Sequence, residues 1–399
     1  MSKKNLSEIL SLDKIEVVKS EINQAHGLPN ECYISEEYLE FERDNVFASS
    51  WTVIGTASSV PEAGDTIPFD LLGIPLIVVR DKNQKIKVFH NVCSHRGHKL
   101  IDKPCKQKNF IVCPYHSWSY NFNGELERTP HIGGLNQHKL ESFDKSRNNL
   151  KEVRSNVWMD LIFVNIDSNA KSFNQHIKPI EDRWSKFITN DDQKLIHRAK
   201  NFGNFQMCVN SNWKFAIENY CESYHLPTIH PELNRVSNIE DHYHIEDENM
   251  TFSGQGSKKY SQQFDGNKKF STFPNWPNNL YENSEYVSLF PNLMLGIHVD
   301  HFFAFWLEPI SMTQTKEHFE MYYVGQESAC SDEYEELREK NFIFWQQVMN
   351  EDVSAIEGMQ KGRKSPVYNG GNFSPIMDSP THLFHKWVAD NLTAKSNAF

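Results

Sequence analysis

Two short segments of this chain each place a cysteine close to a histidine, and this repeated pairing constrains the fold and the chemistry more than any other feature. The first segment contains Cys93-x-His95, and the second contains Cys113-x-x-His116. Thiolates and imidazoles are side chains that suit iron and zinc. The chain has only seven cysteines, so the placement of two of them beside histidines points to one shared metal site.

These four side chains fit two kinds of metal site, and a third interpretation needs no metal. A Cys₂His₂ set can hold one structural zinc ion. The same set can hold a Rieske [2Fe–2S] cluster, in which two cysteines bind one iron and two histidines bind the other. The metal-free alternative is two buried cysteines beside unrelated histidines. The mixed pairs favour the cluster, because zinc fingers more often pair cysteine with cysteine and histidine with histidine.

The sequence around the two loops predicts β-structure. Residues 51–90 consist of short segments rich in Val, Ile and Phe with turn residues between them, and 156–167 reads as a further buried strand. Helical and strand patterns mix after that. We therefore expect an α+β protein with an N-terminal lead at 1–38 that packs on the catalytic domain, an all-β domain at 39–167 and a catalytic domain at 168–399.

A second group of candidate ligands lies in the middle of the chain. Residues 212–225 have helical character, and Pro227 is expected to end or kink that helix. Glu222 and His225 lie on one helical face because they are three residues apart. The kink would bring His230 back toward His225, so that two neutral imidazoles meet one metal ion.

A long helix predicted at about 332–361 supplies the third candidate ligand. Asp352 lies on its apolar stripe, four residues after Val348, and a carboxylate among core positions is costly unless it is paired or binds a metal. The neighbouring Glu351 projects about 100° away and is expected to face solvent. His225, His230 and Asp352 therefore predict a 2-His-1-carboxylate triad, the ligand set of mononuclear Fe(II) oxygenases.

Taken together, the two groups resemble the alpha subunits of Rieske-type, ring-hydroxylating non-haem iron oxygenases. The stretch CSHRGHKL…CPYHSWSYNFNGEL is similar to the Rieske motif of this family, and E-N-Y-x-E-x-Y-H-x₄-H is similar to its iron-binding segment. Ser117 departs from the motif, in which glycine is commoner. The resemblance covers nearly the whole chain. It implies a Rieske domain followed by a helix-grip, Bet v 1/START-like catalytic domain with a curved antiparallel sheet around a pocket.

The resemblance also implies cofactors, partners and a bridging residue. Family members place a carboxylate three residues before the first histidine ligand, where it links that ligand to a Rieske histidine of the next subunit in a trimer. The matching residues here are Glu222, His225 and His116, with Glu where many relatives have Asp. A homotrimer is therefore expected, with a [2Fe–2S] cluster, mononuclear Fe(II) and O₂. Electrons would come from NAD(P)H through a flavin/iron–sulfur reductase, because no nicotinamide-binding glycine motif follows a strand.

Choline monooxygenase and the glycine betaine and carnitine oxygenases are the members that the sequence resembles most. This implies hydroxylation or N-demethylation of a small methylammonium compound, which an aromatic cage would bind. The candidate cage residues are Tyr281, Tyr286, Phe290, Phe302, Phe303, Phe305 and Trp306. Two alternatives remain: hydroxylation or O-demethylation of an aromatic acid, and a non-enzymatic role as a Rieske electron carrier or START-like ligand binder.

Charge and composition exclude other classes of partner. The formal net charge is −11, whereas a nucleic-acid-binding surface is basic. No stretch approaches the roughly 20 apolar residues of a membrane span, and the N-terminus does not read as a secretory signal. We therefore expect a cytoplasmic protein that binds neither nucleic acid nor membrane.

Overall fold

A computed structural model gives the structure of the protein, and it describes residues 6–262, 264 and 268–393. The first residues of the predicted N-terminal lead and the last residues of the predicted catalytic domain lie outside this description. The observed mixture of small β-sheets, one large antiparallel sheet and helices confirms the predicted α+β class. Among the described helices, none is both long and apolar enough to cross a bilayer.

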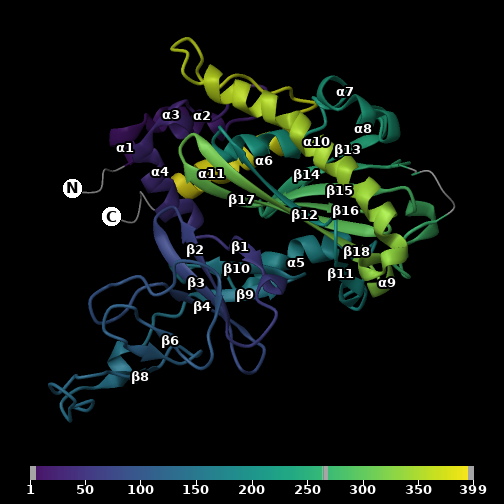
Figure 1. Ribbon diagram of the computed structural model, residues 1–399. Helices are drawn as coiled ribbons and strands as arrows, with labels where there is room; N and C mark the ends of the chain where they lie inside the picture. The colour runs from purple at the N-terminus through teal and green to yellow at the C-terminus, as the bar shows by residue number, and fades with distance from the viewer. Residues whose placement is uncertain (1–5, 263, 265–267, 394–399) are drawn as a thin grey trace. The chain divides into compact units, whose positions relative to one another are not determined.

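The chain forms two compact units. One unit contains residues 48–170, and the other combines residues 1–47 with residues 171–399. The N-terminal segment therefore belongs to the same unit as the C-terminal half of the chain, although the smaller unit lies between them in the sequence. Figure 1 shows both units, with the N-terminal helices in purple close to the yellow C-terminal helix.

The unit of residues 48–170 consists of three small antiparallel sheets, with the strand orders β1-β10-β9, β4-β3-β2-β5 and β6-β7-β8. The strands are β1 (Thr52–Thr56), β2 (Asp65–Leu71), β3 (Ile74–Arg80), β4 (Ile86–His90), β5 (Cys105–Lys106), β6 (Ile111–Val112), β7 (Ser119–Tyr120), β8 (Leu126–Arg128), β9 (Arg154–Trp158) and β10 (Leu161–Asn165). The end of β4 leads directly into the first cysteine–histidine loop, and β6 and β7 flank the second. The strands thus hold the two loops next to each other, with the rings of His95 and His116 in contact.

The larger unit is built on an eight-stranded antiparallel sheet with the order β11-β18-β17-β16-β15-β14-β13, in which β12 also pairs with β18. The strands are β11 (Ile196–Arg198), β12 (Asn204–Val209), β13 (His242–Glu246), β14 (Phe252–Ser257), β15 (Ser284–Leu289), β16 (Leu293–Ile297), β17 (His301–Ser311) and β18 (Gln314–Val324). Nearly every residue from β15 to β18 is buried. Helices must therefore cover both faces of this part of the sheet.

The two faces of this sheet have different neighbours. Phe303 of β17 contacts Trp345 of α10 (Glu335–Gly362), with 4.7 Å between ring centroids. On the same face, α6 (Trp213–Cys221) and α11 (Ser379–Thr393) pack against β14 and β15. The adjacent Phe302 points the other way, toward Trp184 of α5 (Phe173–Trp184). We call the α10-covered side the chamber face; in Figure 1, α10 and α5 lie on opposite sides of the strands.

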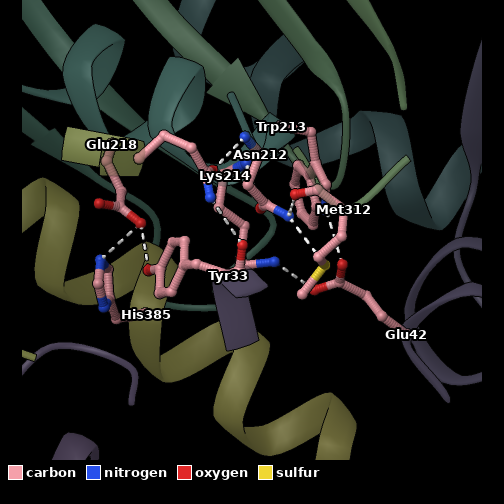
Figure 2. A network of polar contacts seen from close by, with 9 residues as sticks. Tyr33, Glu42, Asn212, Trp213, Lys214, Glu218, Met312 and His385 are labelled. Atoms are coloured by element: carbon pink, nitrogen blue, oxygen red, sulfur yellow. Dashed lines mark hydrogen bonds and ion pairs between the residues drawn. The ribbon is translucent and has the colours of Figure 1, made fainter. Parts of the chain in front are cut away.

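A buried polar network ties the N-terminal segment to α6 (Figure 2). The side chains of Lys214 and Glu42 are both fully buried, and Lys214 Nζ lies 2.8 Å from Glu42 Oε1. The indole N–H of Trp213 donates to the other oxygen of Glu42 at 2.8 Å. Further along α6, Glu218 accepts a hydrogen bond from the Tyr33 hydroxyl and lies 3.3 Å from His385 Nε2. Burial alone would raise the pKa of Glu218, but His385, Arg363 and Tyr33 together hold it below the usual value.

We predict that breaking one half of the Lys214–Glu42 pair destabilises the larger unit strongly. Lys214→Met leaves a buried carboxylate without its cation and should lower the free energy of unfolding by about 3–5 kcal/mol. The double variant Lys214→Met/Glu42→Leu removes both charges and should lose less than the single variant. Urea unfolding followed by tryptophan fluorescence measures both values. A single variant that unfolds at the wild-type midpoint would contradict the prediction.

Candidate metal centres

The two cysteine–histidine loops bring their four side chains together inside the smaller unit. Cys93 and Cys113 are each 2% exposed. The rings of His95 and His116 meet edge to face, with 4.6 Å between centroids. Trp118 stacks on His95 at 4.6 Å and 8°, so its ring fixes the orientation of that imidazole.

The free polar atoms of this cluster match the requirements of a two-iron group. The Nδ1 atoms of His95 and His116 are buried and have no hydrogen-bond partner among the described residues. Such atoms are costly unless something binds them. Two buried thiols and two imidazoles with free nitrogens are the ligand set of a Rieske [2Fe–2S] cluster, in which the cysteines bind one iron and the histidines bind the other.

Turns with positive φ shape both loops. Gly97 has φ of 70° and Ser117 has φ of 58°, and in each loop the backbone N–H of this residue donates to the carbonyl of the cysteine four residues earlier, at 2.9 and 3.0 Å. The left-handed conformation explains why glycine is the usual residue at the position of Ser117. The Tyr120 hydroxyl lies 3.2 Å from Cys93 Sγ and accepts from the backbone of Ser94.

The helix that leads to the second centre ends earlier than the sequence predicts. It was expected to continue to residue 225 and to break at Pro227, but α6 ends at Cys221, and Glu222 has extended backbone with φ of −123° and ψ of 162°. Pro227 instead lies in the first turn of the short helix α7 (Leu226–Ile229). Proline fits there because the N–H groups of a first turn have no partner within the helix. The turn at 222–225 therefore redirects the chain before the first histidine.

Three predicted ligands converge in the larger unit. Ligand atoms of His225, His230 and Asp352 all lie within 4.8 Å of one another. The Nε2 atoms of His225 and His230 are 3.7 Å and 3.0 Å from Asp352 Oδ1. Oδ1 of Asp352 is buried without a hydrogen-bond partner among the described residues. Two imidazole nitrogens and one carboxylate oxygen that converge in this way form a ligand set for a metal ion.

Carboxylates on the opposite side of each imidazole fix its orientation. His225 Nδ1 lies 2.5 Å from Glu222 Oε1, and His230 Nδ1 lies 2.9 Å from Glu351 Oε2. Each Nδ1 is thus occupied, and each Nε2 faces Asp352. The expectation that Glu351 faces solvent was wrong: it contacts His230, and Gln347 donates to it at 2.9 Å. The helical spacing could not reveal this contact, because His230, which immediately precedes α8 (Pro231–Val236), reaches Glu351 only in the folded chain.

The chamber face between α10 and the sheet is lined by aromatic side chains. Of the predicted cage residues, Tyr286, Phe303 and Phe305 lie on this face, whereas Phe302 and Trp306 lie on the opposite face. Phe290 packs against Phe384 and Trp387 of α11. Sequence reasoning missed Phe319 and did not assign Trp345 to the pocket. The alternation in E-H-F-E-M-Y-Y, residues 317–323, was the available signal for Phe319.

A cavity of about 180 Å³ opens at one end of the chamber face. Its walls include Tyr260, Tyr281, His298, His301 and Asn341. The imidazole of His298 is fully buried and stacks on His301 at 4.2 Å; burial and the neighbouring His301 lower its pKa well below the usual value. His298 is therefore neutral. Because neither of its nitrogens has a hydrogen-bond partner among the described residues, it can bind a polar group in the cavity.

Both units match known protein families. Residues 50–142 match the Rieske [2Fe-2S] domain, and residues 196–394 match the catalytic domain of the ring hydroxylating alpha subunit. The predicted cysteine and histidine residues lie within the first match. His225, His230 and Asp352 lie within the second.

Several characterised proteins are similar over most of the chain. The carnitine monooxygenase oxygenase subunit of Acinetobacter pittii is 26% identical over 87% of both chains. The chloroplastic choline monooxygenase of Arabidopsis thaliana is 25% identical over 94% of this chain and 85% of its own.

Solved structures share the fold. A quaternary ammonium Rieske monooxygenase in complex with L-carnitine has a TM-score of 0.73 at 22% identity, covering 96% of this chain and 99% of that chain. Naphthalene 1,2-dioxygenase from Rhodococcus has a TM-score of 0.71 at 17% identity, covering 97% and 98%. The two family models confirm the family that the sequence resembled. The chain is an oxidoreductase that belongs to the Rieske non-haem iron oxygenases, with the Rieske and catalytic domains of their alpha subunits.

Proposed function

We propose that this chain is the terminal oxygenase component of a monooxygenase acting on a methylammonium compound. Cys93, His95, Cys113 and His116 would hold the [2Fe–2S] cluster, and His225, His230 and Asp352 would hold the mononuclear Fe(II). The chemistry supplied by these groups is electron storage and the activation of O₂ for insertion of oxygen into a C–H bond. The convergence of two imidazole nitrogens and one carboxylate oxygen within 4.8 Å of one another is the observation on which the proposal rests.

The carboxylates beside the two histidines orient the imidazoles toward the metal in this proposal. Glu222 accepts the Nδ1–H of His225, and Glu351 accepts the Nδ1–H of His230. Each contact fixes the tautomer that leaves the Nε2 lone pair directed at the metal and makes that nitrogen more basic. The aromatic side chains of the chamber face exclude water from the reacting C–H bond.

Glu222 would also connect the two centres of neighbouring subunits. In the family, a carboxylate at this position joins an iron-ligating histidine to a Rieske histidine of the next subunit, and a solved quaternary ammonium Rieske monooxygenase with the same fold gives insight into inter-subunit electron transfer. We extend this to Glu222 and His116 in a homotrimer. A flavin/iron–sulfur reductase would supply electrons from NAD(P)H. In this proposal, residues 1–38 are a lead that packs on the catalytic domain, residues 39–167 are the Rieske domain and residues 168–399 are the catalytic domain. The acidic composition supports a cytoplasmic location.

The substrate assignment follows from the relatives and from the chamber. Carnitine and choline monooxygenases match most of this chain, and the chamber face presents the aromatic surfaces that bind methylammonium groups. Hydroxylation of an N-methyl carbon gives a carbinolamine, which breaks down to formaldehyde and the demethylated amine. Hydroxylation at the alcohol carbon of choline would instead give an aldehyde hydrate without formaldehyde. Oxidation of an aromatic acid is the second candidate, because the same aromatic side chains form a hydrophobic slot.

We predict that Asp352→Ala impairs the mononuclear iron site and leaves the Rieske cluster intact. The variant loses one of three donor groups of the mononuclear site, so its iron content should fall by one per chain and NADH-driven turnover should fall at least about 100-fold. The visible spectrum of the Rieske cluster should be unchanged. Glu351→Gln, which keeps all three donors, should lose only about tenfold in iron affinity. Full iron occupancy in Asp352→Ala, measured by metal analysis, would refute the assignment.

We predict that Glu222→Gln slows electron transfer without removing either metal centre. Loss of the carboxylate weakens the contact with His225 Nδ1, and turnover should fall about 10–100-fold. Stopped-flow absorbance should show that the reductase still reduces the cluster at the wild-type rate, whereas reoxidation by O₂ and substrate is slow. Glu232→Gln, on the exposed side of α8, is the matched control. Equal reoxidation rates in both variants would argue against a bridging role.

The substrate assignment is tested by O₂ uptake with a reductase and NADH. Carnitine, γ-butyrobetaine, glycine betaine, choline and simple benzoates are offered separately, and formaldehyde and peroxide are measured together. Uptake matched by formaldehyde with a methylammonium compound supports demethylation. Uptake with choline but without formaldehyde supports hydroxylation at the alcohol carbon. Uptake with benzoates alone would overturn the methylammonium assignment.

A further inference from the structure

Glu317 in β18 is a buried carboxyl group that lacks the partners of other buried glutamates on the sheet. It is 1% exposed, and its Oε1 has no hydrogen bond among the described residues. By contrast, Glu285 pairs with Arg183, and Glu320 pairs with Arg198. A buried carboxyl group without a hydrogen-bonded partner costs free energy. A buried group that costs free energy in this way is a candidate for a role in function.

The register of the strands places Glu317 on the chamber face. It lies opposite Leu307 of β17 and Met207 of β12. Phe319, two residues further along, is on the same face because side chains alternate along a strand; its ring lies 5.3 Å from that of Phe303, which contacts α10. Glu317 therefore points toward the side of the sheet that α10 covers.

The course of α10 places Glu317 on the same stretch of the sheet as the proposed iron site. Phe342 of α10 contacts Phe205 of β12, and Glu357 accepts from the backbone of Asn210 just after β12, so Asp352 lies over the strand stretch that pairs with Glu317. Burial and, to a smaller extent, the charge of Asp352 raise the pKa of Glu317 to about 8. A cation near Glu317 would favour its ionised form.

The charges of the proposed reaction supply a reason for a second carboxylate. A dipositive iron held by two neutral imidazoles and one carboxylate carries one net positive charge, and the carboxylates of Glu222 and Glu351 lie behind the imidazoles, on the side away from the iron. A trimethylammonium group adds another and cannot lose a proton to escape the repulsion. Bringing two positive groups together in a dry pocket is unfavourable unless a negative group is close to them. Aromatic faces such as Phe303 and Phe319 contribute attraction, but they carry no net charge.

We propose that Glu317 is the counter-ion for the cationic head group of the substrate and determines the preference of the enzyme for a cation over an uncharged or anionic compound. This inference rests on the proposed function and deepens it. A benzoate would meet a carboxylate rather than a cation at this position, so Glu317 disfavours the aromatic-acid alternative. Because Glu317 contacts the substrate and not the metal, its loss should change substrate affinity and leave metal content unchanged.

Binding to pairs of compounds that differ only in charge tests this inference. γ-Butyrobetaine is compared with 5,5-dimethylhexanoate, and choline with 3,3-dimethylbutan-1-ol, in which carbon replaces the quaternary nitrogen. Titration calorimetry on the iron-loaded, anaerobic protein gives affinities without turnover. Wild type should bind at least one cation at least about tenfold more tightly than its neutral-headed partner. Glu317→Gln should lower that affinity about 10–100-fold and change the partner's affinity less than about threefold.

Two further variants serve as controls. Glu317→Asp keeps the charge and should retain most of the preference for the cation. Glu308→Gln removes one negative charge from the other face of β17, where Glu308 contacts His318 at 2.7 Å, and should retain the full preference. Because an amide needs no counter-charge, Glu317→Gln should fold at least as stably as wild type, which urea unfolding measures; its iron content and Rieske spectrum verify that both centres are intact.

The outcomes separate the two proposals. An equal loss of affinity for both members of a pair would show a packing role for Glu317, and no loss for either would show no role; each result overturns this inference. If wild type releases formaldehyde from a methylammonium compound while Glu317→Gln keeps the cation preference, only this inference fails. If wild type prefers neither cation, this inference fails, and the methylammonium assignment fails with it only if no methylammonium compound supports O₂ uptake.

Discussion

The packing of α10 along the sheet is the constraint on which the proposed iron site depends. His225 and His230 come from a turn and a short helix after α6, whereas Asp352 comes from a helix more than a hundred residues later. Contacts such as Trp345 with Phe303 and Phe342 with Phe205 fix where that helix lies. The position of Asp352 is therefore set by aromatic packing about two or more helical turns away, because a helix transmits position along its length.

The sequence predicted the chemistry of the two centres better than the local backbone that holds them. The cysteine–histidine spacing and the placement of Asp352 on an apolar stripe are local patterns, and the structure brings those side chains together. The sequence predicted that the helix ends at Pro227, whereas α6 ends just before Glu222. Proline breaks a helix interior but is equally suited to the first turn of a new helix, so its position alone does not locate the end. The contact of Glu351 with His230 could not be foreseen, since it joins residues 121 positions apart.

The pocket was the least predictable part of the site. Alternation along β17 showed that Phe302 and Phe303 must point in opposite directions, but which of them faces the chamber depends on which side α10 covers. The same ambiguity concealed Glu317, which reads in the sequence as one more charged residue in E-H-F-E. The face on which Glu317 lies follows only from the strand register and the placement of α10 together. Neither of these can be read from a short sequence segment.

The division of the chain has a consequence for the way such enzymes can be recombined. Residues 48–170 form an internal cassette, and the larger unit is assembled from the pieces before and after it. Lys214 and Glu218 on α6 are bonded to Glu42 and Tyr33 of the first piece. An exchange of everything up to residue 170 between two relatives would split these buried contacts between different parents. Replacing the cassette alone keeps both halves of each contact from one parent, so chimeras with two crossover points should tolerate greater divergence than chimeras with one.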